Sequence, residues 1–311
     1  MTQRPARPRI EWRDVDGILL LEKPVGLSSN HALQRARRLY RAAKAGHTGS
    51  LDPLASGVLP LCFGQATKVA GLLLDSDKAY AAVVALGIRT STGDAEGEVA
   101  ERAPVPALDE GRLAALAREF TGEREQVPPM YSALKRDGEA LYALARRGIE
   151  VEREARTIRI ESLTLEILDA TRIGIEVRCS KGTYIRTLGE DLARALGTVG
   201  HLESLSRTSV AAFEGRPTHA LEALEALAGN EAALDEKLLP VDVALAGYPA
   251  LHLSAGEAGR FLKGQPVVPE GPAASGGMGS WRIYEAGGRF LGIGIEADDA
   301  GRIRAQRVMC R

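Results

Sequence analysis

The alternating segment at residues 173–180 restricts the folds open to this chain more than any other part of its sequence. Its apolar residues alternate with small or polar ones: Ile173, Ile175, Val177 and Cys179 against Gly174, Glu176, Arg178 and Ser180. A period of two predicts a β-strand, because successive side chains of a strand point to opposite faces of the sheet. A helix is expected soon after it, since leucines recur at helical spacing until a glycine ends the pattern: Leu188, Leu192, Leu196 and Gly197.

The N-terminal half also contains signals for both kinds of element. Residues 17–22 form a short apolar run closed by Lys23-Pro24, which is typical of a buried strand. A helix is predicted after Ser28, whose hydroxyl can cap it, and another around Leu113. A further strand is predicted over residues 78–87, where apolar residues share one face.

The pattern changes beyond Pro240. Ser254 and Glu257 form a capping box before a short helix, and strand-like runs follow at three places: 281–284, 289–295 and 303–309. This end of the chain is therefore expected to form a small β-rich module. A length of 311 residues also favours one large domain plus a smaller one.

The charges balance in number but are unevenly distributed. Forty basic side chains against 41 acidic ones predict, by their total, no polyanionic partner. However, no carboxylate occurs between Glu22 and Asp52, a second basic cluster lies within 135–159, and the segment 222–242 is mostly acidic. Such separation is expected of a phosphate-binding face with a solvated acidic back, and scattered solvated helix faces are the alternative interpretation.

Metal, disulfide and membrane signals are weak. The three cysteines, Cys62, Cys179 and Cys310, lie far apart without a CxxC pair, which argues against a disulfide framework and a thiolate site. Asp75 and Asp77 beside a lysine make a poor cage for a cation. No run approaches the length of a membrane span. We therefore expect a cytoplasmic protein that needs no metal.

Residues 46–60, GHTGSLDPLASGVLP, are the first candidate for a functional site. They are too rich in glycine and proline to predict regular structure, yet they carry few charges, so a packed functional loop is expected. Asp52 in this loop is a candidate nucleophile, although an aspartate before proline is more often a turn or cap residue. A carboxylate in apolar surroundings needs a cation to stay ionised, and Arg186 and Lys23 are candidates.

Three other residues can be interpreted in two ways each. His47 is either a structural hydrogen-bonding histidine or part of the site. Tyr80 is either an aromatic on the buried face of its strand or a residue that stacks on a base. Arg186, after the alternating strand, is either a cap or phosphate contact or a group presented to a cleft.

Six segments, in order from residue 23 to residue 188, carry a family resemblance. They are Lys23-Pro24 with Gly26 and Ser28-Ser29, the block at 46–60, LLDSDKAY at 73–80, LGIRTSTGDAEGEV at 86–99, PPMYSALK at 128–135, and CSKGTYIRTL at 179–188. With these segments the chain strongly resembles the TruB family of tRNA pseudouridine-55 synthases. It departs from the family at Ser206-Arg207, where two arginines are common, and at Val210-Ala211, where a glycine often follows the valine. These departures put local RNA contacts in doubt, but not the chemistry.

The resemblance implies an α+β fold. Residues 1–246 would form a pseudouridine synthase catalytic domain, with a mixed or antiparallel central sheet flanked by helices and an RNA-clamping insertion at about 124–156. Residues 247–311 would form a small, β-barrel-like PUA-type RNA-binding domain. By position, Asp52, Tyr80 and Arg186 match the family's catalytic residues. The expected RNA contacts are Lys23, Arg35, Arg38, Arg41, His47, Lys135, Lys181, Tyr184 and Arg207.

The implied function is conversion of uridine to pseudouridine at position 55 in the T-loop of tRNA, by base flipping and attack of an aspartate at C6 or C1′. The T-arm would be the partner of a monomer that requires no cofactor, membrane or protein partner. One alternative is a non-catalytic tRNA-folding chaperone on the same scaffold. A nucleotide-dependent transferase is a weaker one, because no phosphate-loop motif occurs. A guide-RNA-dependent synthase is disfavoured by the basic insertion.

Overall fold

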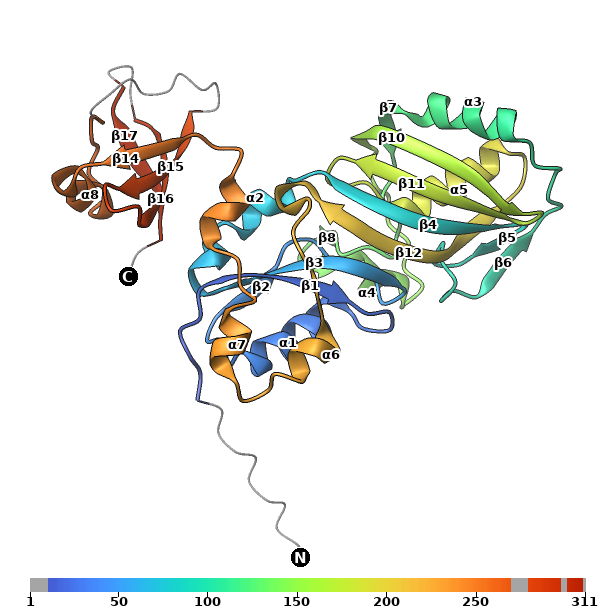
Figure 1. Ribbon diagram of the computed structural model, residues 1–311. Coiled ribbons are helices and arrows are strands. Elements are labelled where there is room, and N and C mark those ends of the chain that lie inside the picture. Colours follow the sequence, from blue (N-terminus) through green and yellow to red (C-terminus); the bar gives the residue numbers. More distant parts are fainter. Residues whose placement is uncertain (1–10, 270–278, 298–300, 310–311) are drawn as a thin grey trace, which may run out of the picture.

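A nine-stranded sheet forms the centre of the larger part of the molecule (Figure 1). The computed structural model describes residues 11–269, 279–297 and 301–309. The strand order is β13 (His219–Ala220), β1 (Gly17–Lys23), β3 (Ala55–Phe63), β12 (Gly200–Val210), β4 (Lys78–Leu86), β11 (Arg172–Cys179), β10 (Arg156–Asp169) and β7 (Gly122–Gln126), with β2 (Ala45–His47) paired to β3. The pairs β1–β13 and β3–β12 are parallel and the others are antiparallel. The expected mixed central sheet is confirmed.

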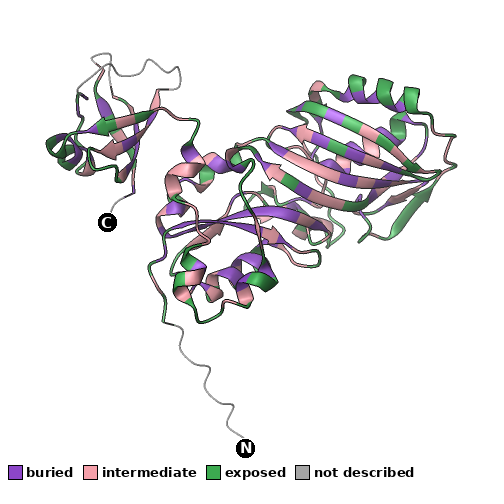
Figure 2. Cartoon of the chain, in the orientation of Figure 1, coloured by how far each residue is buried: buried purple, intermediate pink, exposed green. Residues whose placement is uncertain are grey.

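Strands β4, β10, β11 and β12 share a core with helices α3 (Glu110–Phe120) and α5 (Ile185–Ala195). In β11 the alternation predicted from sequence is confirmed, since its four apolar residues are buried and Glu176 between them is exposed. Figure 2 shows this alternation of buried and exposed residues along the strands. Helix α5 places Leu188 and Leu192 in the same core, and Gly197 follows its end with a φ of 87°. The start of α5 is thereby fixed against the sheet.

Strands β1 and β3 pack against helices α1 (Ser29–Leu39), α6 (Leu221–Glu225) and α7 (Glu231–Asp235) (Figure 1). The Ser28 hydroxyl caps α1 by accepting a hydrogen bond of 3.2 Å from the amide of His31. The strand predicted at 17–22 and the helix predicted after Ser28 are both confirmed.

Residues 46–60 differ in part from the expectation. An irregular loop covers residues 48–54, but Ala55–Phe63 form the mostly buried strand β3. The prediction that this block lacks regular structure is therefore wrong for residues 46–47, which belong to β2, and for residues 55–60. Strand β3 lies between β1 and β12, where pairing on both sides and burial outweigh the poor strand propensity of Gly57 and Pro60.

The C-terminal residues form a separate four-stranded sheet, ordered β14 (Ala250–Leu253), β15 (Ser280–Glu285), β16 (Phe290–Glu296) and β17 (Ile303–Val308). Helix α8 (Ala255–Leu262) begins at the predicted capping box of Ser254 and Glu257 and buries Phe261. The β-rich module is confirmed, but the barrel-like form is not. Within the described residues the sheet is open, with β14 and β17 as its edges, because no ladder closes four short strands into a ring.

The remaining elements are short: η1 (Gly64–Lys68), α2 (Ala70–Leu74), β5 (Ile88–Thr90), β6 (Val99–Arg102), β8 (Lys135–Arg136), β9 (Glu139–Ala140), α4 (Leu141–Ala145), η2 (Ala211–Phe213) and η3 (Val241–Leu245). An apolar cluster that includes Val69, Leu245 and Ile293 connects the C-terminal sheet to the larger part of the molecule. Cys62 and Cys179 are buried free thiols, and Cys310 lies outside the described residues. Across the described ranges, no helix combines the length and apolar character needed to cross a membrane.

Candidate active site

Asp52 lies in the loop between β2 and β3, and the backbone on both sides of it is fixed. The buried Ser29 hydroxyl accepts a hydrogen bond from the Leu51 amide at 2.7 Å and donates one to the Leu51 carbonyl at 3.0 Å. The Gly26 amide donates to the carbonyl of Pro53 at 2.8 Å. The constrained backbone expected from the sequence is present, and it leaves 44% of the Asp52 side chain exposed.

Arg186 is the second residue of α5 and brings a buried guanidinium to this carboxylate. Its Nη2 lies 3.0 Å from Oδ2 of Asp52, and only 7% of its side chain is exposed. The guanidinium also donates to the carbonyl oxygens of Thr92, at 2.8 Å, and of Tyr131. These partners fix the cation from three segments, so its orientation toward Asp52 does not depend on the ion pair alone.

Asp94 is a second carboxylate beside the same guanidinium, and sequence reasoning missed it. Its Oδ2 lies 3.7 Å from Nε of Arg186, and 5% of its side chain is exposed. It accepts hydrogen bonds from the Thr92 hydroxyl and, at 3.1 Å, from the Glu96 amide. The segment 86–99 that carried the resemblance contained this signal, because an aspartate there is surrounded by threonine and glycine.

The environment of Asp52 raises its pKa above the ordinary value for aspartate. Burial is the main cause and the nearby charge of Asp94 adds to it, whereas Arg186 and then Lys23 oppose the rise. A carboxylate that is less solvated and more basic is a better nucleophile than one in bulk water. The site therefore combines a carboxylate of raised pKa with a cation that stabilises its ionised form.

Tyr80 on β4 lies where the two main apolar cores meet, since it packs against both. Its backbone is opposite Arg207 on β12 and opposite Val177 on β11. Burial raises the pKa of Tyr80, and Arg207 opposes this rise, with a smaller upward contribution from the Asp52 charge. The structure thus brings the phenol, the nucleophile candidate and two arginines into one region.

Lys23 and His47 are two further basic residues of this region, since Arg207 acts on the pKa of both and Asp52 on that of Lys23. Lys23 is fully buried at the end of β1, and its ammonium donates to the carbonyl oxygens of Pro24, at 2.9 Å, and of Leu27. Burial lowers its pKa to about 8, although Asp52 pulls it upward. In His47, burial and then Arg207 lower the pKa, and Nδ1 is buried without a hydrogen-bond partner among the described residues.

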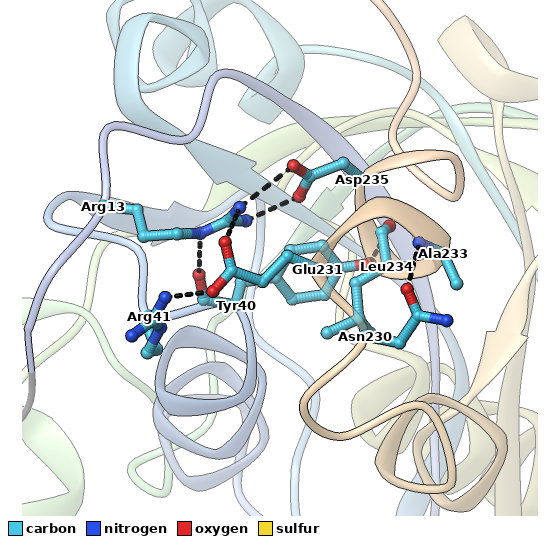
Figure 3. A network of polar contacts seen from close by, with 8 residues as sticks. All are labelled: Arg13, Tyr40, Arg41, Asn230, Glu231, Ala233, Leu234 and Asp235. Carbon is cyan, nitrogen blue, oxygen red and sulfur yellow. Dashed lines mark hydrogen bonds and ion pairs between the residues drawn. The ribbon is translucent and has the colours of Figure 1, made fainter.

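The arginines of α1 and of the turn after it are not arranged as the charge pattern suggested. Arg35 forms a bidentate ion pair with Glu225 of α6, and Arg41 pairs with Glu231 of α7. Figure 3 shows Arg13 joining the same network by bonding Glu231 and Asp235. The expected separation of this acidic segment from the basic residues is therefore wrong for Glu225, Glu231 and Asp235, although their side chains remain 39–45% exposed.

The other predicted RNA contacts occupy diverse positions. Arg38 and Lys135 are exposed, and Lys181 is exposed but pairs with Asp75 at 2.8 Å. Tyr184 is half-buried at the start of α5, where the side-chain amide of Gln126 binds both its amide and its carbonyl. Arg207, by contrast, is buried in the interior with 1% exposure. The sequence could not distinguish these cases, because each looks like a basic or aromatic residue near a motif.

Three family models match successive parts of the chain. They describe the TruB family pseudouridylate synthase N-terminal domain at 37–185, the tRNA pseudouridylate synthase B C-terminal domain at 186–246, and the pseudouridine synthase II TruB C-terminal region at 249–309. The tRNA pseudouridine synthase B of Nitrosococcus oceani is 50% identical over 303 residues, which cover 97% of each chain. That of Ectopseudomonas mendocina is 53% identical over 300 residues and 96% of each chain. The chain belongs to the TruB family. It is a tRNA pseudouridine synthase, an isomerase, and tRNA is its substrate.

Solved structures share the TruB fold at low sequence identity. A chain of a Cbf5–Nop10–Gar1 complex has a TM-score of 0.71 at 20% identity, over 98% of this chain and 92% of its own length. A chain of an H/ACA RNP bound to a substrate RNA containing 2′-deoxyuridine has a TM-score of 0.70 at 19% identity, over 95% and 85%. At such identities the likeness shows a common fold alone.

Proposed function

We propose that this enzyme converts uridine to pseudouridine at position 55, in the T-loop of tRNA, with Asp52 as its nucleophile. The observation that carries the proposal is the ion pair between Asp52 and the buried guanidinium of Arg186, at 3.0 Å. A carboxylate held this way at a partly exposed position can meet a base that has been flipped out of its stack.

The chemistry is an internal rearrangement of the nucleoside. The bond from N1 of uracil to C1′ of ribose breaks, the ring turns, and a bond from C5 to C1′ forms. The proton on C5 is then lost and N1 gains one, so no oxidant, reductant or external group is consumed. Asp52 would attack either C6 of the ring or C1′ of the ribose, since an ionised carboxylate serves both routes.

The neighbouring residues have separate roles in this proposal. Arg186 stabilises the ionised form of Asp52 and keeps it oriented. Tyr80 stacks on the flipped base and takes part in removing the C5 proton. Binding of the rest of the RNA supplies the free energy that unstacks the target.

We further propose that residues 1–246 act as the catalytic domain and 247–311 as a PUA-type RNA-binding domain. Within the former, the insertion at about 124–156 would clamp the T-arm. This proposal is supported by a direct contact between the insertion and the site: the carbonyl of Tyr131 accepts a hydrogen bond from Arg186. The exposed Lys135 and Arg136 on this insertion suit contact with phosphates. We expect a monomer that works without a guide RNA or protein partner.

The decisive experiment is pseudouridine mapping in tRNA transcripts treated with the purified protein. We expect one new pseudouridine, at position 55, and the same product in an isolated T-arm hairpin. A transcript with cytidine at position 55 should remain unmodified. Modification at another uridine, or dependence on an added guide RNA, would contradict the proposal.

A further inference from the structure

Arg207 is the largest side chain that is fully buried in the described part of the molecule, with 1% exposure. In the sheet it stands opposite Gly57 of β3 on one side and Tyr80 of β4 on the other. The sequence predicted an RNA contact here, but the guanidinium is buried and bonds the carbonyl oxygens of Val58 and Gly49. Arg207 is therefore placed to act on the residues of the active site and not on the surface of the RNA.

The guanidinium bonds two segments that hold the nucleophile loop. Its Nε donates to the Val58 carbonyl at 2.7 Å, and its Nη2 donates to the Gly49 carbonyl at 3.3 Å. These carbonyls lie on either side of Asp52 in the sequence, so the single planar group ties the loop at both ends. A lysine has no planar fork with which to make both bonds in the same way.

The approach of β12 to β3 is unusually close at this point. A Cβ atom on Gly57 would lie 2.2 Å from the carbonyl oxygen of Arg207, and Gly57 has a φ of 102°. Only glycine fits these two conditions. The glycine thus brings the Arg207 backbone, and with it the guanidinium, against the strand that follows Asp52.

The charge of Arg207 has no carboxylate partner among the described residues, because it forms none of their ion pairs. Its neighbours include Lys23, Lys78 and His47, whose pKa values are lowered first by burial and also by the charge of Arg207. A buried cation among other basic groups costs stability. The sequence therefore places charge here at the expense of the fold, as is typical of functional sites.

The Arg207 charge also acts on the Tyr80 phenol, whose ionised form it stabilises. Tyr80 stands directly opposite Arg207 in the strand register, and burial raises the pKa of its phenol, whereas the Arg207 charge opposes the rise. Without that cation the phenol would be a poorer participant in proton removal.

We infer that Arg207 is an internal positioning residue for the isomerisation: it ties the Asp52 loop at Gly49 and Val58 and sets a fixed positive charge beside the Tyr80 phenol. It acts through these two residues and does not touch the RNA. This inference rests on the proposed function, since it assigns Arg207 to the chemical step of that reaction.

The test compares Arg207→Lys and Arg207→Met with the wild-type enzyme in single-turnover reactions on a T-arm hairpin. For Arg207→Met we expect the rate constant to fall by about 10²-fold, while the Kd for RNA stays within about twofold. Arg207→Lys should recover part of the rate, because it keeps the charge and loses the fork. Arg172→Met is the control, because Arg172 is an exposed arginine of the same sheet, and both of its values should equal those of wild type.

Two outcomes would overturn the inference. One is a wild-type rate constant in both Arg207 variants, and the other is a loss of RNA affinity that accounts for the whole loss of rate, which would restore the predicted RNA contact. Melting curves show whether Arg207→Met is folded. If Arg207→Met is unfolded, the rate constant and Kd of Arg207→Lys decide the test. Because the wild-type enzyme is assayed alongside, failure to modify position 55 would refute the proposed function instead.

Discussion

Two buried arginines, Arg186 and Arg207, border the same site but have different kinds of partner. Arg186 lies between two carboxylates, Asp52 and Asp94, and forms an ion pair with each. In the described structure, Arg207 donates hydrogen bonds only to carbonyl oxygens, and its charge acts on the basic groups Lys23, His47 and Lys78. Under the proposed function, Arg186 keeps the Asp52 nucleophile ionised, whereas Arg207 braces the Asp52 loop and the Tyr80 phenol from inside the protein.

The largest difference is expected when the paired cation is removed. Arg186→Met should lower the single-turnover rate by about 10²–10³-fold, because it leaves Asp52 and Asp94 facing each other without the guanidinium that stabilises both. It should also raise the pKa of Asp52. Arg194→Met on the same helix, an exposed arginine paired with Asp191, is the matched control and should react normally. A wild-type rate in Arg186→Met would show that the ion pair with Asp52 is not needed for the reaction.

A smaller effect is expected at the second carboxylate. Asp94→Asn removes one partner that orients Arg186, so the maximal rate should fall by about tenfold. It also removes a charge that raises the pKa of Asp52, so the acid limb of the rate profile should move to lower pH. A pH series of single-turnover rates would show both changes. A limb that moves to higher pH would mean that Asp94 affects Asp52 in another way.

The pH dependence of the wild-type rate should also reflect the raised pKa of Asp52. Only the ionised form of Asp52 can attack, so the rate should fall as pH decreases through its pKa. Because burial raises that pKa, the fall should begin at a higher pH than an ordinary aspartate would give. RNA binding measured across the same range separates protonation of Asp52 from weaker binding. A rate that stays constant down to the ordinary aspartate range would contradict the effect of burial.

The smallest effect concerns paired and unpaired arginines on the surface of α1. Arg35 is held by Glu225, whereas Arg38 is exposed. If α1 contacts phosphate, Arg38→Gln should weaken RNA binding by a few fold and lower the slope of log K against log salt by about one. Arg35→Gln should change both values less, because phosphate must compete there with a carboxylate. Equal losses in the two variants would show that the ion pair opens on binding.

Local patterns were sufficient to predict much of the fold. The alternation in β11, the leucine spacing of α5 and the capping box of α8 each depend on residues close in sequence, and all three are confirmed. Strand β3 was missed over residues 55–60 because its stability comes from neighbours on both sides of the sheet. The open C-terminal sheet likewise depends on long-range strand pairing that no local pattern encodes.

The main residues of the candidate site could be predicted from the sequence, but several of their partners could not. Asp52 and Arg186 were expected together and lie together, whereas Asp94 was overlooked although it lies in a quoted motif. The neutralisation of Arg35 and Arg41 could not be read from the chain, since their partners are 190 residues away in each case. The burial of Arg207 was also hidden, because it follows from the meeting of β3, β4 and β12.

The most direct test of the nucleophile is release of tritium from C5 of labelled uridine 55 by Asp52→Asn in a T-arm hairpin. We expect no release above background, while the Kd for the same hairpin stays close to the wild-type value, because the amide keeps the shape of the side chain but cannot attack. Release by the variant at the wild-type rate would contradict the assignment of Asp52 to the chemical step.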